Sequence, residues 1–206
     1  MTRHELVFDA VTPMLLKLGF KKRAGGIFTI DLSKDVIGVI GLNRATKHRP
    51  PGEVEINPVV GVRHQEVERL VAELRGDKFH AYQPSTIATP LGYVMPENRY
   101  RSWVFTVDRA ETVATEMVAT IAAHGLAFMH SMKGLTDLCR ALDEGRVGFE
   151  HQLAYRRPVA WLLAGDPMRA REKLDQSVAA LGDRSDLAAE ELRRFATALW
   201  GRLSSA

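Results

Sequence analysis

The chain of 206 residues contains a single cysteine, Cys139. One thiol forms no disulfide within the chain, so we expect a fold that depends on its core and a protein of the reducing cytoplasm. Cys139 shares helical spacing with Leu135, Leu138 and Leu142. This pattern predicts a small buried hydrophobe, whereas a nucleophilic role needs a basic neighbour that generates the thiolate.

A strong excess of charge of one sign is also absent. The 28 Lys and Arg residues stand against 25 Asp and Glu residues, which gives a formal net charge of +3. This balance is too slight to dictate a polyanionic partner. With 46% hydrophobic and 26% charged residues, the composition is that of a soluble globular protein.

Long hydrophobic runs are missing as well. No window reaches the roughly 18–20 uninterrupted apolar residues that cross a bilayer. The N-terminal residues are amphipathic from the start and lack the apolar stretch of a signal peptide. The sequence therefore predicts no membrane partner and a cytoplasmic location.

Several catalytic and cofactor motifs are missing too. The chain has no phosphate loop ending in Gly-Lys-Ser/Thr, no dinucleotide fingerprint after a strand and no Gly-x-Ser-x-Gly elbow. The seven histidines include no His-Glu-x-x-His pair, and Cys139 has no second thiol, so we predict neither a metal site nor a cofactor. Spacing alone assembles no nucleophile, base and orienting group, and the catalytic residues of any activity stay unknown at this level.

Strand patterns occupy the first half of the chain. They cover residues 27–32, 36–42, 54–62 and 103–107, with a further candidate at 87–94. The first alternates apolar and polar residues, and the second is apolar on both faces, like a central strand covered by helices. Pro58 in the third favours an edge position or a bulge. Because the connections are too short for crossover helices, we expect an antiparallel sheet of four to five strands.

Helical periodicity precedes, interrupts and follows these strands. A first helix ends at Gly19, and a later one breaks at Gly125. Beyond that point only helical patterns remain. We therefore predict the α+β class, in which the sheet packs against helices over residues 1–125 and an all-helical C-terminal extension, a helical bundle, covers residues 126–206.

The C-terminal helices carry three local predictions. Asp166-Pro167 combines an N-cap residue with proline at the first helical position, which predicts a helix start and an αα-hairpin around it. In the last helix Trp200 shares a side with Phe195, which predicts core packing. Arg156 and Arg157 are predicted to lie on a helix surface.

One stretch of the chain is similar to a known family. Its order is Leu18-Gly19-Phe20-Lys21-Lys22, then Gly26-Ile27-Phe28-Thr29-Ile30, then the apolar strand at 36–42 and Val54-Glu55-Ile56-Asn57. This order resembles the bacterial family of uncharacterised DUF4304 domains over roughly the first 125 residues. The resemblance implies an α+β fold and carries over no catalytic residue.

Two basic clusters are the candidate ligand-binding residues. The first comprises Arg44, Lys47, His48 and Arg49, ahead of a stiff Pro-Pro pair, and the second comprises Arg99 and Arg101, with Tyr100 between them. Alternating guanidinium groups and aromatic rings grip phosphates and stack on bases. The alternative is that both clusters are solvated loops, since a nearly neutral chain exerts little long-range attraction on nucleic acid.

Three functional hypotheses follow. The favoured one is a non-enzymatic binding or protein-interaction module, with an immunity or regulatory role in the bacterial cytoplasm and another protein as partner. The second is nucleic-acid binding through the two basic clusters. The third is an enzyme of unrecognised type that draws on His64, Asp77, His80 and Tyr82 in the irregular middle segment, because catalytic groups often come from loops distant in sequence.

Overall fold

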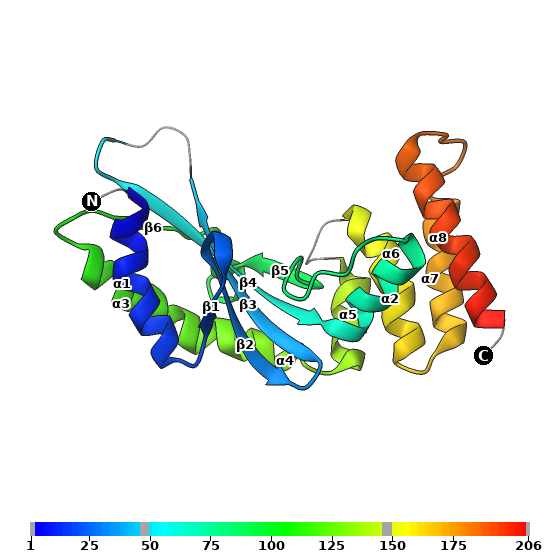
Figure 1. Ribbon diagram of the computed structural model, residues 1–206, viewed down its shortest axis with the longest axis horizontal. Coiled ribbons are helices and arrows are strands. Elements are labelled where there is room, and N and C mark those ends of the chain that lie inside the picture. The colour runs from blue at the N-terminus through cyan, green and yellow to red at the C-terminus, as the bar shows by residue number, and fades with distance from the viewer. Residues whose placement is uncertain (1–2, 46–49, 146–149, 205–206) are drawn as a thin grey trace. The chain divides into compact units, whose positions relative to one another are not determined.

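A computed structural model describes residues 3–45, 50–145 and 150–204 (Figure 1). The chain divides into two compact units, each made of two segments. Unit 1 comprises Met1–Val62 and Ala88–Ser131, and unit 2 comprises Arg63–Ile87 and Met132–Ala206. The predicted α+β class is confirmed, because the strands lie in the N-terminal half and the described residues after Leu126 form helices and turns only.

A six-stranded sheet forms the centre of unit 1. Its order is β1 (Lys21–Lys22), β2 (Ile27–Ser33), β3 (Val36–Arg44), β4 (Val54–His64) and β5 (Ile87–Pro90), and β6 (Trp103–Phe105) also pairs with β4. The pairs β1–β2, β2–β3 and β4–β6 are antiparallel. The first seven residues of β3 are all buried, which agrees with the apolar run that predicts a central strand.

The strand β1 arises from the short basic segment after the first helix. Lys21 lies opposite Thr29 of β2, and its Nζ donates to Asp31 Oδ2 at 2.6 Å. The Nε of Arg23 donates to Thr29 Oγ1 at 3.0 Å. These two contacts hold the basic segment against β2, and β1 is the outer strand on this side of the sheet.

The sequence predicts an edge position or a bulge at Pro58, and the structure contradicts the edge position. β4 lies between β3 and β5 in the sheet, so the edge position is wrong. β6 pairs with β4 through Val54, Glu55 and Ile56 only. Pro58 follows this paired stretch, where its missing N–H interrupts no hydrogen bond to β6.

The helices of unit 1 are α1 (Arg3–Lys17), α3 (Ala110–Thr120) and α4 (Leu126–Ser131), with the short 3-10 helices η1 (Ala24–Gly26) and η2 (Leu91–Val94) and the π-helical segment η3 (Ile121–Gly125). The predicted break at Gly125 is wrong, because η3 is a single π-helical segment through which α3 continues into α4. A Cβ on Gly125 would lie 3.2 Å from Val60 Cγ1. Glycine therefore lets the helix approach β4 closely instead of ending it.

The continuous helix Ala110–Ser131 is long and apolar enough to cross a membrane by length and composition. Its side chains Met117, Ile121 and Met129 are fully buried in unit 1. A buried core helix of a soluble protein passes the same test. One such helix is weak support for a membrane protein.

The described part of unit 2 consists of helices and their connecting loops, together with the end of β4 and the start of β5. It contains α2 (Gln65–Arg75), α5 (Leu135–Glu144), α6 (Glu150–Leu163), α7 (Pro167–Ala179) and α8 (Leu187–Ser204). The central helix α6 packs against the other four. Because α2 packs on α6 and α8, residues Arg63–Ile87 belong with the C-terminal helices, and the units differ in this respect from the predicted division at residue 125.

Of the predictions for the C-terminal helices, the start of α7 is confirmed and the core position of Trp200 is wrong. Asp166 is the N-cap of α7, and its Oδ1 accepts from the backbone N–H of Arg169 at 2.9 Å. Phe195 is fully buried, with its ring edge-to-face against Tyr155 at 4.9 Å. The core position of Trp200 is wrong, because the residue is half-buried and its Nε1 donates to Asp175 Oδ1 at 2.9 Å.

Candidate functional site

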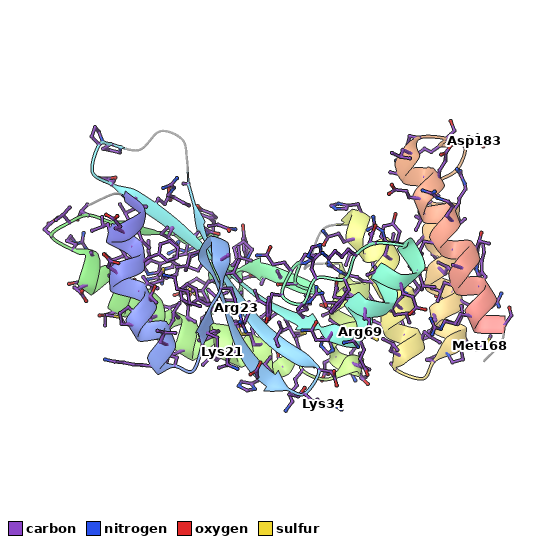
Figure 2. All side chains as sticks on the ribbon, viewed as in Figure 1. Lys21, Arg23, Lys34, Arg69, Met168 and Asp183 are labelled. Carbon is purple, nitrogen blue, oxygen red and sulfur yellow. The ribbon has the colours of Figure 1, made fainter. Side chains whose placement is uncertain are left out.

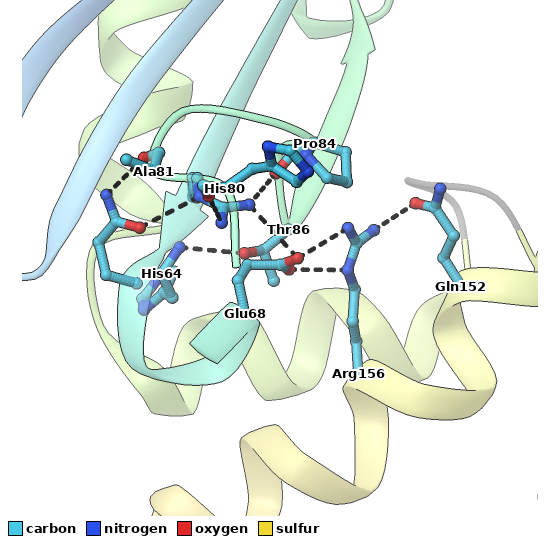
Figure 3. Close-up of polar contacts among 10 residues, drawn as sticks. His64, Glu68, His80, Ala81, Pro84, Thr86, Gln152 and Arg156 are labelled. Carbon is cyan, nitrogen blue, oxygen red and sulfur yellow. Dashed lines mark hydrogen bonds and ion pairs between the residues drawn. The ribbon is translucent and has the colours of Figure 1, made fainter. Parts of the chain in front are cut away.

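Three charged side chains are buried together where β4 meets α2 in unit 2. Arg63 lies at the end of β4. Glu68 lies in the first turns of α2, and Arg156 comes from the middle of α6 (Figure 3). Their exposed fractions are 1% for Arg63, 6% for Glu68 and 3% for Arg156. Charged residues are this deeply buried only when they are paired, so their contacts decide the chemistry of this charged cluster.

Glu68 is shared by the two arginines. Nε of Arg156 lies 2.8 Å from Oε1 of Glu68, and its Nη2 donates to Oε2 at 3.1 Å, so the guanidinium meets both oxygens. Nη1 of Arg63 lies 3.4 Å from the same Oε2. Two guanidinium groups thus face one carboxylate, and the charged cluster carries a net charge of +1.

Arg63 also fixes the loop that follows α2. Its Nη1 and Nη2 donate to the carbonyl oxygens of Pro84 and His80, and its Nε donates to Gln65 Oε1 at 3.1 Å. The amide of Gln65 donates to the carbonyl of Ala81 at 2.8 Å. Side chains of β4 and α2 thereby satisfy the backbone of a loop that forms no regular structure.

Burial governs the electrostatics of Arg63. Loss of solvation lowers its pKa to about 10, an effect that Glu68 opposes and Arg156 reinforces. The guanidinium therefore remains cationic at neutral pH. Its carbon centre lies 5.2 Å from the ring centroid of Phe79, and the guanidinium of Arg69 lies 5.2 Å from the same ring. These cation–π contacts hold Phe79 beside the charged cluster.

A cavity of about 330 Å³ lies against the charged cluster within unit 2. Its charged lining consists of the cations Arg63, Arg75, Lys78 and Arg156 and the carboxylates Glu68 and Asp77. Four positive and two negative side chains give the wall a net charge of +2, with His80 counted as neutral. The carbon-rich lining consists of Val71, Ala72, Phe79, Pro84 and Tyr155. We call this space the Arg156 cavity.

Two cationic groups of the Arg156 cavity have donors to spare. Nη1 of Arg156 donates to Gln152 Oε1, and its other two nitrogens meet Glu68, so one N–H on each of Nη1 and Nη2 remains for a ligand. The exposed Lys78 forms no hydrogen bond or ion pair with any residue that the structure describes. Arg75 is already occupied, since its Nε lies 3.1 Å from Asp77 Oδ2 and its guanidinium covers the ring of Tyr155 at 4.5 Å.

The four residues of the enzyme hypothesis lie in different surroundings. Asp77 and His80 do line the Arg156 cavity. Nε2 of His64 lies 2.8 Å from the carbonyl oxygen of Met132, which can only accept, so Nε2 carries the proton. Burial lowers the pKa of His64, although the Met132 carbonyl, Glu68 and Glu66 oppose the shift. Tyr82 is 43% exposed.

The predicted basic clusters belong to unit 1. Lys47, His48 and Arg49 lie outside the described residues, and Arg44 is exposed at the end of β3. The other cluster lies on the turn after η2, where Arg99 and Arg101 line a cavity of about 340 Å³.

Arg101 is not free to bind a phosphate. Its Nη2 donates to Glu116 Oε1 at 2.6 Å, and its guanidinium lies 5.0 Å from the Trp103 ring. Glu116 also accepts from Trp103 Nε1 at 3.2 Å. The carboxylate balances the charge of Arg101, which leaves Arg99 as the exposed cation of this cluster.

Sequence reasoning missed all three members of the charged cluster. The predicted surface position of Arg156 is wrong, because α6 packs against α2 and buries the side chain. A signal for this existed in the spacing. Arg156 follows Leu153 by three positions and precedes Ala160 by four, and both are buried, so it shares the apolar face of α6.

Comparison with known proteins gave no match. No family model matches the chain, and neither a curated protein nor a solved structure matches it. The resemblance to DUF4304 domains therefore stays a prediction. Within residues 3–45, 50–145 and 150–204, no group of three or more His, Cys, Asp or Glu residues is placed to hold a metal ion. The chemistry of the site must be inferred from the Arg156 cavity itself.

Proposed function

We propose that this protein is a non-enzymatic binding module and that the Arg156 cavity takes an anionic group of the bound molecule. The observation that carries the proposal is the charged cluster, in which two buried guanidinium groups share the single carboxylate of Glu68. An uncompensated positive charge in a buried wall is unfavourable, and an anion beside it offsets that cost.

Rigid elements support the binding role. Glu68 and Arg156 come from two packed helices, and Gln152 holds Arg156 from one turn earlier on α6. A guanidinium that is already fixed loses little conformational entropy when it binds an anion. Each of its two remaining N–H groups can donate to an oxygen of a carboxylate or phosphate.

The lining favours binding over catalysis. The described residues that line the Arg156 cavity include no Ser, Thr or Cys side chain, and both oxygens of Glu68 are in contact with arginines. The single thiol, Cys139, is fully buried, and burial raises its pKa to about 12. The wider hypothesis of a protein partner in the cytoplasm, in an immunity or regulatory role, is part of this proposal.

The proposal is tested by anion binding to the full chain. Isothermal titration calorimetry with inorganic phosphate, sulfate and succinate, at constant ionic strength, should detect saturable binding of at least one anion. Lys78→Ala should weaken it about fivefold, which corresponds to about 1 kcal/mol. Lys34→Ala is the matched control, because Lys34 is an exposed lysine at the β2–β3 turn of unit 1 (Figure 2).

Two outcomes would contradict the proposal. One is that none of the three anions binds. The other is that Lys78→Ala and Lys34→Ala change the affinity equally, which would mean that the anions bind by general attraction to a basic surface rather than in the Arg156 cavity.

A further inference from the structure

The charge of the Arg156 cavity indicates how many charges its ligand carries. Arg75 is paired with Asp77 and Glu191, so the positive charges of the wall that lack a carboxylate of their own are the +1 of the charged cluster and the +1 of Lys78. A phosphate monoester carries about −1.5 to −2 charges at pH 7. A monocarboxylate carries one negative charge and would leave the wall cationic. The balance therefore favours a dianion.

The donors of the Arg156 cavity favour phosphate among the dianions. Arg156 offers one N–H on each of Nη1 and Nη2, and Lys78 adds an ammonium group with three donors from the loop after α2. Three oxygens on one phosphorus can meet both cations at once. In a dicarboxylate the two charges sit on separate carbon atoms, and each carboxylate offers only two oxygens.

The size of the Arg156 cavity indicates that the ligand is larger than a phosphate group. A water molecule occupies about 30 Å³ of liquid. A phosphate group of five heavy atoms thus fills only part of a cavity of about 330 Å³. The remaining lining includes Val71, Ala72 and Pro84, which suit an organic substituent.

We propose that the anionic group is the phosphate of a phosphate monoester, held by Arg156 and Lys78, with its organic part against Val71 and Pro84. This inference rests on the proposed function and names the ligand class of the same site. The monoester comes from a phosphorylated small molecule or from a phosphorylated side chain, because both present the same three oxygens and an organic ester group.

The test compares four probes by calorimetry on the full chain at pH 7.5: phenyl phosphate, inorganic phosphate, succinate and benzoate. Phenyl phosphate should bind about tenfold more tightly than each of the others. Lys78→Ala should reduce its affinity about fivefold, and Lys34→Ala should leave it unchanged. Amide NMR shifts of Lys78, Phe79 and His80 should move on titration with phenyl phosphate, whereas those around Lys34 should not.

The outcomes separate this inference from the proposed function. If succinate or benzoate binds as tightly as phenyl phosphate, the phosphate assignment is overturned while anion binding stands. If inorganic phosphate equals phenyl phosphate, the organic part of the assignment is overturned. If no probe binds, both proposals fall. If phenyl phosphate binds most tightly, glycerol 3-phosphate and a phosphoserine peptide are compared next. Tighter binding of glycerol 3-phosphate indicates a phosphorylated small molecule, tighter binding of the peptide indicates a phosphorylated side chain, and either result supports the assignment.

Discussion

Arg156 and Glu68 form a two-pronged ion pair between residues that are 88 positions apart in the chain, with nitrogen–oxygen distances of 2.8 Å and 3.1 Å. The pair joins α6 to α2. Because both side chains are buried, each requires the other, and Arg63 adds a second positive charge on the same carboxylate. The stability of unit 2 and the proposed anion binding therefore involve the same side chains.

Removal of the shared carboxylate should be strongly destabilising. Glu68→Gln leaves two buried guanidinium groups without a counter-charge, and the expected loss in the free energy of unfolding is about 3–5 kcal/mol. Urea unfolding of the full chain measures it. Glu66→Gln is the control, because Glu66 is exposed in the same helical turn, and it should change stability by less than about 0.5 kcal/mol. Equal effects of the two changes would show that the charged cluster does not stabilise the fold.

The thiol of Cys139 should be inert in the folded protein. Burial raises its pKa to about 12, so almost none of it is thiolate at pH 8. A colourimetric disulfide reagent should release no signal from the native chain at pH 8 and one equivalent in concentrated urea. Rapid reaction of the native chain would contradict the burial of this residue on α5.

His64 should make stability depend on pH below its unfolded pKa. Burial lowers the folded pKa of His64 below the ordinary value of 6.5, so the unfolded chain binds the proton more readily. The contribution is therefore complete above pH 6.5 and decreases as the pH falls below it. Unfolding free energies at pH 5, 6 and 7 measure this slope.

The matching variants isolate the contribution of His64. His64→Gln keeps an N–H that can donate to the Met132 carbonyl but does not titrate, so its stability should fall less between pH 7 and pH 5 than that of the natural chain. His130→Gln, at an exposed position of α4, should keep the natural slope. An unchanged slope in His64→Gln would assign the pH dependence to other groups.

Gly92 should be indispensable for the turn that carries Arg99 and Arg101. A Cβ at this position would overlap the carbonyl oxygen of Arg99 and lie 2.8 Å from the backbone nitrogen of Arg101. Gly92→Ala should therefore cost about 1–3 kcal/mol of unfolding free energy. Gly201→Ala, where a Cβ meets nothing within 4 Å in α8, should instead stabilise the helix by about 0.5–1 kcal/mol. Similar effects at the two glycines would refute the close packing of this turn.

The nucleic-acid alternative predicts that removal of the basic residues near Arg44 weakens oligonucleotide binding, whereas the proposed function predicts no change. Since Glu116 balances Arg101 and the formal net charge is only +3, we expect the triple variant Arg44→Ala/Lys47→Ala/Arg49→Ala to bind a single-stranded oligonucleotide as the natural chain does. Fluorescence anisotropy over a range of salt concentrations measures this. A steep salt dependence that disappears in the triple variant would favour nucleic-acid binding instead.

Local chemistry made part of this fold predictable. The alternation over residues 27–32 identifies β2, and Asp166 with Pro167 identifies the start of α7, because strand faces and helix caps depend on residues a few positions apart. Gly125 shows where local rules fail. A glycine that ends a helix and one that lets a helix approach a strand look the same in sequence, and only the contact with Val60 separates them.

The class of the fold, the order of most of its strands and helices, and the burial of Cys139 could be predicted from the sequence, because hydrophobic periodicity acts over a few residues. Which of two adjacent arginines joins the charged cluster depends on how the chain folds. Arg157 donates to the carbonyl of Leu142 at 2.6 Å, while its neighbour Arg156 meets Glu68. A charge becomes a binding group through the dielectric and the partners around it, and these come from segments that the chain brings together only when it folds.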